Sequence, residues 1–248
     1  MDLEEHIIID MVRNKRRLMP RLGGRKLYHL LSEDLEEVGK IGRDKFFDIL
    51  RRNDLLVERK RSSTKTTQSY HRFHKWSNLL KGVELTRSNQ AWGSDITYLR
   101  TVEGFVYLFL ITDLYSRKIV GWSLSRSLSI EGGLEALNLA LRNIKNNKKT
   151  LIHHSDRGIQ YCSKAYIETL QNHRVSISMT EENHCYENSK AERVNGILKD
   201  EFYLNSTFNN FEQALKTVRS AINIYNEHRP HWSLQLKTPS LVHEQNAA

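Results

Sequence analysis

The sequence predicts a mixed α/β domain, a sheet with helices on both faces, preceded by a small all-helical domain. Three observations predict it. Apolar residues before residue 58 recur at helical spacing, three strand-like segments follow one another from residue 89, and helical and strand-like patterns then alternate. We expect a helical region at 1–58, a basic linker at 59–88, the α/β domain at 89–205, and a C-terminal helix and tail at 206–248 that pack on the domain.

The first region contains three predicted helices. The first carries Leu3, Ile7, Ile8 and Met11 on one face and ends before Pro20. A second short helix is expected at Lys26–Leu31, and a third at Arg43–Asn53 after a turn marked by Gly39 and Gly42. The third helix directs its apolar side chains inward (Phe46, Phe47, Leu50) and its basic side chains outward (Arg43, Lys45, Arg51, Arg52). A basic helix after a glycine-containing turn is the outline of a helix-turn-helix, so we expect these four basic residues to contact DNA.

The charge of the chain supports a polyanionic partner. The chain has 38 Lys and Arg against 29 Asp and Glu, a net charge of +9, and most of the excess lies in the first 75 residues. An ordinary solvated basic surface is the alternative, since charge bias alone is weakly specific. Nucleic-acid binding is favoured because phosphate neutralisation dominates such affinity.

Composition excludes several classes of protein. The hydrophobic fraction of 39% is enough for a core, and 3 Pro and 12 Gly exclude collagen-like sequence. Two cysteines cannot form a disulfide framework. The longest apolar run, Phe105–Ile111, is far shorter than the roughly 20 residues of a membrane helix, and the acidic N-terminus does not resemble a signal peptide. We therefore expect a soluble cytoplasmic protein without a membrane partner.

The α/β domain begins with three strands. The segment Trp92–Thr101 alternates loosely, and Gly104 follows it as a turn. The run Phe105–Ile111 is continuously apolar, as in a strand buried on both faces, and Lys118–Ser123 has the pattern of a third strand. Three strands in succession predict an antiparallel meander.

Helices and strands then alternate. Helices are predicted through Leu134–Ile144, at Ser163–His173 and at Asn188–Phe202, with strands at Thr150–His154 and Val175–Ser178 between them. A final long helix carries Phe211, Leu215, Val218, Ile222 and Tyr225 and ends before Pro230. We also expect Trp232 in the core.

Three acids occupy unusual positions in this pattern. Asp95 lies within the first strand, Asp156 follows the fourth, and Glu192 lies beside the apolar stripe of the next-to-last helix. If the first and fourth strands are neighbours, Asp95 and Asp156 lie close together. Clustered carboxylates repel one another, so a divalent cation explains them best, and oxygen ligands suit Mg²⁺ or Mn²⁺. Two such ions would support phosphoryl transfer.

Two other interpretations compete with this one. Since the chain has 29 acidic residues, three at some chosen spacing could be ordinary surface acids. A zinc site could instead use His153, His154, Cys162, His184 and Cys185. The chain has no C-x-x-C pair, and neighbouring His153 and His154 would point to opposite faces of a strand, so zinc is disfavoured.

The sequence around the acids resembles a known family. Asp156 and Glu192 are separated by 35 residues, and the contexts are Trp-x-x-Asp-Ile-Thr-Tyr at 92–98, His-Ser-Asp-Arg-Gly-x-Gln-Tyr at 154–161 and Asn-x-x-Ala-Glu at 188–192. With the segment 113–122 and Arg229-Pro230-His231, this resembles the D,D(35)E core of retroviral-integrase-like transposases. The closest match is the bacterial insertion-sequence class that encodes its catalytic protein in the second of two overlapping frames. The sequence departs from the commonest family residues at a few positions (Asn183, His184, Glu187, Ser189, Lys190, Arg193, Val194, Asn195).

The resemblance implies an RNase H-like fold, an N-terminal helix-turn-helix and metal-dependent DNA cleavage and strand transfer. Carried over, Asp95, Asp156 and Glu192 become the catalytic and metal-binding residues for two Mg²⁺ or Mn²⁺ ions. The implied partners are terminal inverted repeats, target DNA, a second copy of the chain and an upstream-frame DNA-binding protein, which would place the protein at the bacterial nucleoid.

Three further residues are candidates for DNA contact. Arg157 neighbours Asp156, while Asn188 and Lys199 share a helix face with Glu192. Asn188 could instead cap its helix. A DNA-binding protein without catalysis, and a nuclease of the same fold, remain alternatives to a transposase.

Overall fold

The computed structural model describes residues 3–58, 74–144, 150–181 and 188–245. The chain divides into two compact units, the first containing the N-terminal helices and the second containing the sheet. No helix in these ranges is long and apolar enough to cross a membrane.

Within residues 3–58, the N-terminal unit contains four helices, α1 (Leu3–Leu18), α2 (Gly24–Leu30), α3 (Ser32–Gly39) and α4 (Arg43–Arg52). They bury a compact apolar core that includes Ile8, Val12, Leu27, Leu35, Phe46 and Leu50. The sequence analysis missed α3, because this acidic helix buries only Leu35 and so lacks an apolar stripe. The turn expected before the basic helix is present, and Lys40 ends α3 there in the left-handed conformation (φ 53°).

The second unit is built on one mixed sheet with the strand order β3-β2-β1-β4-β5. The strands are β1 (Ala91–Thr101), β2 (Gly104–Asp113), β3 (Ile119–Ser125), β4 (Leu151–Ser155) and β5 (Val175–Met179). The predicted antiparallel meander of the first three is confirmed, and β4 and β5 run parallel to β1. The expected pairing of the first and fourth strands is therefore confirmed. A short strand that the sequence analysis missed, β6 (Thr207–Phe208), pairs with the far end of β1.

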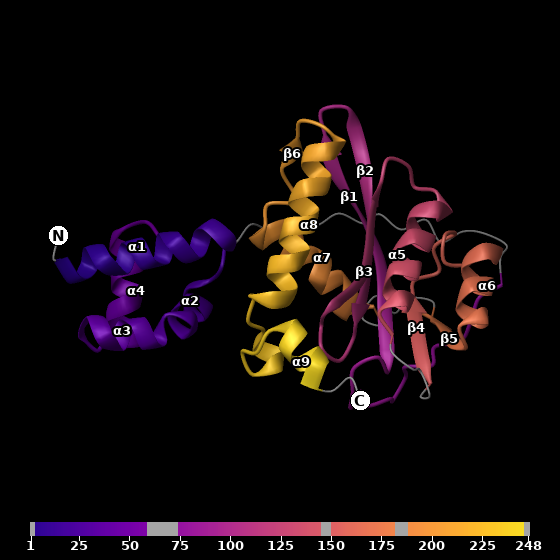
Figure 1. Ribbon diagram of the computed structural model, residues 1–248, viewed down its shortest axis with the longest axis horizontal. Helices are drawn as coiled ribbons and strands as arrows, with labels where there is room; N and C mark the ends of the chain where they lie inside the picture. Colours follow the sequence, from indigo (N-terminus) through magenta and orange to yellow (C-terminus); the bar gives the residue numbers. More distant parts are fainter. Residues whose placement is uncertain (1–2, 59–73, 145–149, 182–187, 246–248) are drawn as a thin grey trace. The chain divides into compact units, whose positions relative to one another are not determined.

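Helices cover both faces of this sheet. Figure 1 shows α5 (Ile130–Arg142) and α6 (Lys164–Asn172) on one side, and α7 (Ser189–Glu201), α8 (Phe211–Glu227) and α9 (Pro239–Gln245) on the other. The mixed α/β prediction is confirmed. The sequence analysis missed α9 and the short 3₁₀ turn Trp232–Leu234.

Two aromatic residues expected in the core lie at the surface. Trp232 is 57% exposed, because it begins the 3₁₀ turn after Pro230 while its neighbour His231 is buried. Phe105 is 48% exposed at the tip of the β1–β2 hairpin, although the rest of that run from Leu108 is buried. The predicted burial of Trp232 was wrong. The predicted burial of Phe105–Ile111 is wrong for Phe105 at the tip and confirmed from Leu108 onward.

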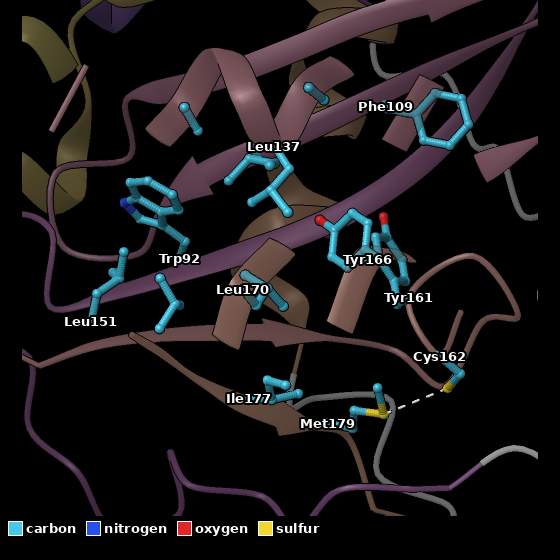
Figure 2. Packing of buried hydrophobic residues seen from close by; sticks show 14 residues of the cluster. Trp92, Phe109, Leu137, Leu151, Tyr161, Cys162, Tyr166, Leu170, Ile177 and Met179 are labelled. Carbon is cyan, nitrogen blue, oxygen red and sulfur yellow. Dashed lines mark hydrogen bonds between the residues drawn. The ribbon is translucent and has the colours of Figure 1, made fainter. Parts of the chain in front are cut away.

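The main apolar core lies between the sheet and α5 and α6. Figure 2 shows Trp92, Phe109, Leu137, Tyr166 and Leu170 packed together. Close approach of α5 to β3 depends on a glycine, since a Cβ on Gly121 would lie 2.3 Å from the Ala136 carbonyl oxygen. The absence of a side chain at residue 121 therefore lets α5 pack closely against the sheet.

Candidate active site

Strand β1 sends alternate side chains to the two faces of the sheet. Trp92 enters the apolar core, and Asp95, three residues later, points to the opposite face. Gly93 is paired with His154 on the parallel strand β4. Two residues further along both strands, Asp95 is level with Asp156, so the strand pairing brings these two acids to one edge.

Asp156 lies in the turn just beyond β4. Its Oδ1 accepts a hydrogen bond of 2.9 Å from the backbone N–H of Gly158. A Cβ at residue 158 would lie 2.9 Å from the same oxygen. The glycine therefore lets the turn hold the carboxylate against the backbone.

Helix α7 carries the third acid to this edge. Asn188, just before the helix, donates from Nδ2 to the Ser94 carbonyl oxygen at 3.0 Å, and Asn195 donates from Nδ2 to Asp95 Oδ2 at 2.6 Å. Glu192 lies between these asparagines on the same helix. The close approach requires Gly93, since a Cβ there would lie 2.7 Å from Leu114 Cδ2 and 3.2 Å from Ala191 Cβ.

The three acids interact electrostatically. Burial raises the pKa of Asp95 to about 7, the bond from Asn195 opposes this shift, and repulsion from Asp156 and Glu192 adds to it. Burial and the negative charge of Asp156 also raise the pKa of Glu192. The structure thus brings together the three acids that the sequence singled out, and their negative charges destabilise one another.

The chemistry of this edge suits a hard divalent cation. Carboxylate oxygens are the preferred ligands of Mg²⁺ and Mn²⁺. Asn195 Oδ1 adds a buried oxygen without a hydrogen-bond partner in the described part of the chain. Among the described residues, no three His, Cys, Asp or Glu side chains converge closely enough to hold one ion. An ion here would be held by fewer of these acids, together with water or substrate oxygens.

A buried polar network underlies the site on the core side. His153 Nε2 lies 2.6 Å from Ser94 Oγ and 3.0 Å from the Tyr166 hydroxyl. Burial lowers the pKa of His153 to about 3, which keeps its ring neutral. The network ties β1, β4 and α6 together next to Asp95. The network is not evident in the local sequence, because Ser94 is 59 positions away from His153.

The zinc interpretation finds no support in the described residues. His153 lies in the network with Ser94, whereas His154 Nδ1 lies 2.8 Å from Ser178 Oγ on β5. Cys162 packs with its sulfur 3.7 Å from that of Met179, as Figure 2 shows. The other two candidates, His184 and Cys185, lie outside the described residues, as do Asn183 and Glu187.

The candidate DNA contacts on the second unit differ in accessibility. Arg157 is half-buried beside Asp156. Lys199 is also half-buried, and its Nζ lies 4.9 Å from the centre of the Tyr98 ring. Asn188 is buried, and its amide is directed at β1. With 4% of Asn188 exposed and its Nδ2 bonded to β1, its expected contact with phosphate stays a prediction that the burial disfavours.

The four basic residues of α4 are exposed, as predicted. Each lies beside a carboxylate. Lys45 Nζ is 3.0 Å from Glu4 and Arg52 is 3.7 Å from Glu5, both on α1, while Arg43 and Arg51 pair with Asp44 and Asp48 of their own helix. The pairs of Arg43 and Arg51 are exposed and therefore weak, and all four cations are accessible, so a phosphate can compete for them.

Comparison with known proteins gives a consistent family. The family description "Integrase core domain" matches residues 86–185, and a second with the same description matches residues 173–239. The chain is 36% identical over 217 residues to an insertion element IS600 31 kDa protein of Shigella sonnei, which covers 86% of this chain and 79% of that protein. It is 35% identical over 184 residues to transposase InsF of insertion sequence IS3A of Escherichia coli K12, which covers 73% of this chain and 64%, less than two thirds, of that protein.

Solved structures with the same fold are more distant in sequence. The magnesium-bound catalytic core of HTLV-2 integrase matches with a TM-score of 0.50 at 19% identity, over 62% of this chain and 96% of that one. A simian T-cell lymphotropic virus intasome matches with a TM-score of 0.53 at 18% identity, over 89% of this chain and 74% of that one. These likenesses confirm the RNase H-like integrase core fold.

Proposed function

The chain belongs to the bacterial insertion-sequence transposases with an integrase core domain, and we propose that it uses Asp95, Asp156 and Glu192 to cleave element ends and join them to target DNA. The observation that carries the residue assignment is the placement of the three acids. They come from β1, the turn after β4 and α7, and each of Asp95 and Glu192 interacts electrostatically with Asp156.

In this proposal the three acids hold two divalent cations, Mg²⁺ or Mn²⁺. Such ions lower the pKa of a nucleophile and stabilise the leaving oxygen during displacement at phosphorus. The protein's own residues supply oxygen ligands on rigid elements and align a phosphodiester with a water or a DNA 3′-hydroxyl. No covalent bond between protein and DNA is required. Arg157 and Lys199 offset the charge of flanking phosphates.

The helical unit is proposed to bind DNA through α4. Its basic side chains are exposed, and each pairs with a carboxylate that it can exchange for a phosphate (Arg43, Lys45, Arg51, Arg52). Recognition of terminal repeats would then belong to residues 1–58 and chemistry to residues 89–205. Joining two element ends favours at least two copies of the chain on DNA, with an upstream-frame protein as a further partner.

Cleavage and joining of labelled terminal-repeat DNA in Mg²⁺ or Mn²⁺ test the catalytic assignment. Asp95→Asn and Glu192→Gln should each lower both rates by about 10³-fold or more, since both steps use the same carboxylates. Glu131→Gln, an exposed acid on the other side of the sheet, is the matched control and should retain activity. Undiminished activity in Glu192→Gln would refute the assignment. DNA binding without metal-dependent cleavage would instead favour a non-catalytic DNA-binding protein.

Salt dependence tests the role of α4. The double variant Arg51→Ala, Arg52→Ala should weaken DNA binding and reduce the slope of log affinity against log salt by about 1 for each lost phosphate contact. Arg142→Ala, at the exposed end of α5, should leave the slope unchanged. An unchanged slope in the double variant would exclude α4 from the interface.

A further inference from the structure

Helix α7 is fastened to β1 by two asparagines, one on either side of Glu192. Asn188 lies four residues before Glu192 and Asn195 three residues after it, so all three share one helix face. Their partners differ. Asn188 Nδ2 donates to a backbone oxygen, that of Ser94, whereas Asn195 Nδ2 donates to the carboxylate of Asp95.

The orientation of the Asp95 carboxylate depends on two donors. The backbone N–H of Ile96 donates to Oδ1 at 3.0 Å, and Asn195 donates to Oδ2 at 2.6 Å. The terminal torsion of an aspartate is broad, so a carboxylate with one local bond could rotate. Of these two donors, Asn195 is the one from another element, and it is 6% exposed, so packing limits its own motion.

The chemical type of this donor matters as well as its position. Lys or Arg at residue 195 would neutralise Asp95 and compete with a cation for it. The neutral amide donates a hydrogen bond to the carboxylate, yet leaves its negative charge in place. The other lone pairs of both carboxylate oxygens stay available to a ligand.

We propose that Asn195 is a positioning residue, which orients the Asp95 carboxylate toward Glu192 and Asp156 and thereby sets the affinity of the site for a divalent cation. The inference rests on the proposed function, in that it takes these acids as the metal ligands. It goes beyond that function by assigning a role to a neutral residue of α7 outside the three acids. Hydrogen-bond partners of metal-binding groups typically change metal affinity by about 10–100-fold when removed.

Mn²⁺ binding to the full-length chain without DNA, measured by calorimetry, tests the proposal. Asn195→Leu, which nearly keeps the size of the side chain and removes the donor, should weaken Mn²⁺ binding about 10–100-fold. Asn188→Leu is the matched control, because it removes the other bond between α7 and β1 without touching a carboxylate, and should change the affinity less than about threefold. Thermal unfolding of both metal-free variants measures the structural loss that they share.

Failure of the positioning role and failure of the metal site itself give different results. Equal weakening in the two variants, or unchanged affinity in Asn195→Leu, would overturn the positioning role. Should Asn195→Leu fail to fold, Asn195→Ser replaces it, because the smaller side chain fits the same space and its hydroxyl is too short to reach Asp95; the same weakening is expected. If Asp156→Asn binds Mn²⁺ as tightly as the natural chain, the metal site itself is refuted.

Discussion

Strand β1 contributes to both faces of the sheet, and the two faces are built differently. On the side of α5 and α6, Trp92 is fully buried in an apolar cluster. On the side of α7, Asp95 of the same strand accepts a hydrogen bond from Asn195 of the helix. Gly93 lies so close to the helix that a Cβ there would approach Ala191. The α5 and α6 side is stabilised by apolar packing, whereas the α7 side holds carboxylates whose negative charges repel one another.

In the second unit, the core face therefore contributes mainly to stability and the face with the acids mainly to function. Substitutions on the core face should lower the free energy of unfolding and affect activity only through it. Substitutions at the acidic edge, formed by Asp95, Asp156 and Glu192, should abolish activity. Where they remove charge they should also increase stability, since functional sites are often locally destabilising.

Asp156→Asn should have the largest effect. The amide oxygen can keep the bond from the Gly158 N–H, while the charge that repels Asp95 and Glu192 is lost. Cleavage should fall by about 10³-fold or more. The melting temperature of the metal-free protein should nevertheless rise by about 2–4 °C, equivalent to about 1 kcal/mol. A lower melting temperature by calorimetry would contradict the comparison.

Trp92→Ala tests the core face. The side chain is fully buried, and its Nε1 donates to Asn89 Oδ1 at 3.0 Å, so truncation should cost about 3–5 kcal/mol in urea unfolding. Trp232→Ala is the matched control, because that side chain is 57% exposed and should change stability by less than about 0.5 kcal/mol. Similar losses in the two variants would show that the assigned core is wrong.

Sequence analysis predicted the elements with strong apolar patterns and missed those without one. The strands and helices of the α/β domain were placed closely, because each buries a periodic stripe such as that of α7 (Ala191, Val194, Leu198). It missed α3, which buries only Leu35, and β6, which has two residues. Trp232 was misplaced because hydrophobicity alone does not show which way a side chain turns after a proline.

The acids were singled out from sequence, but the contacts that hold them were not. Asp95 lies within a strand, Asp156 follows the end of a strand and Glu192 lies beside the apolar stripe of a helix, and all three stand in distinctive local sequences. Asn195, Gly93 and His153 contact Asp95, Ala191 and Ser94, which lie 100, 98 and 59 positions away in the chain, so only the fold brings these contacts together. Tertiary partners of this kind are invisible to local pattern.

Gly93→Ala should have an intermediate effect. The added Cβ would meet Leu114 and Ala191, so α7 must move away from β1, at a cost of about 1–3 kcal/mol. Cleavage should fall with it, because Glu192 moves with the helix. Gly196→Ala on α7 has open space for a Cβ and should instead stabilise by about 0.5–1 kcal/mol. Urea unfolding and cleavage rates of both variants test whether the space at Gly93 is needed. Equal effects in the two variants would show that it is not.

The smallest expected effect is the pH dependence due to His153. Its folded pKa of about 3 lies below the ordinary value of 6.5, so below pH 6.5 the unfolded chain takes up a proton that the folded protein does not. Stability should therefore fall by about 1 kcal/mol between pH 6.5 and 5.5 through this group. The two neighbouring tyrosines do not titrate there, because burial raises the pKa values of Tyr161 and Tyr166 further above their ordinary value of 10. Asp95 acts in the opposite direction, since its raised pKa of about 7 costs stability as pH rises from 3.8.

Comparing the natural chain with His153→Gln isolates the histidine, because the contribution of Asp95 is common to both. The difference in their unfolding free energies should shrink by about 1 kcal/mol from pH 6.5 to 5.5, as the natural chain loses the stability that a non-titrating side chain retains. A constant difference would mean that the ring takes up its proton in the folded state. His153 and its two hydrogen-bond partners would then form part of the charged α7 side of the sheet and not of the neutral core side.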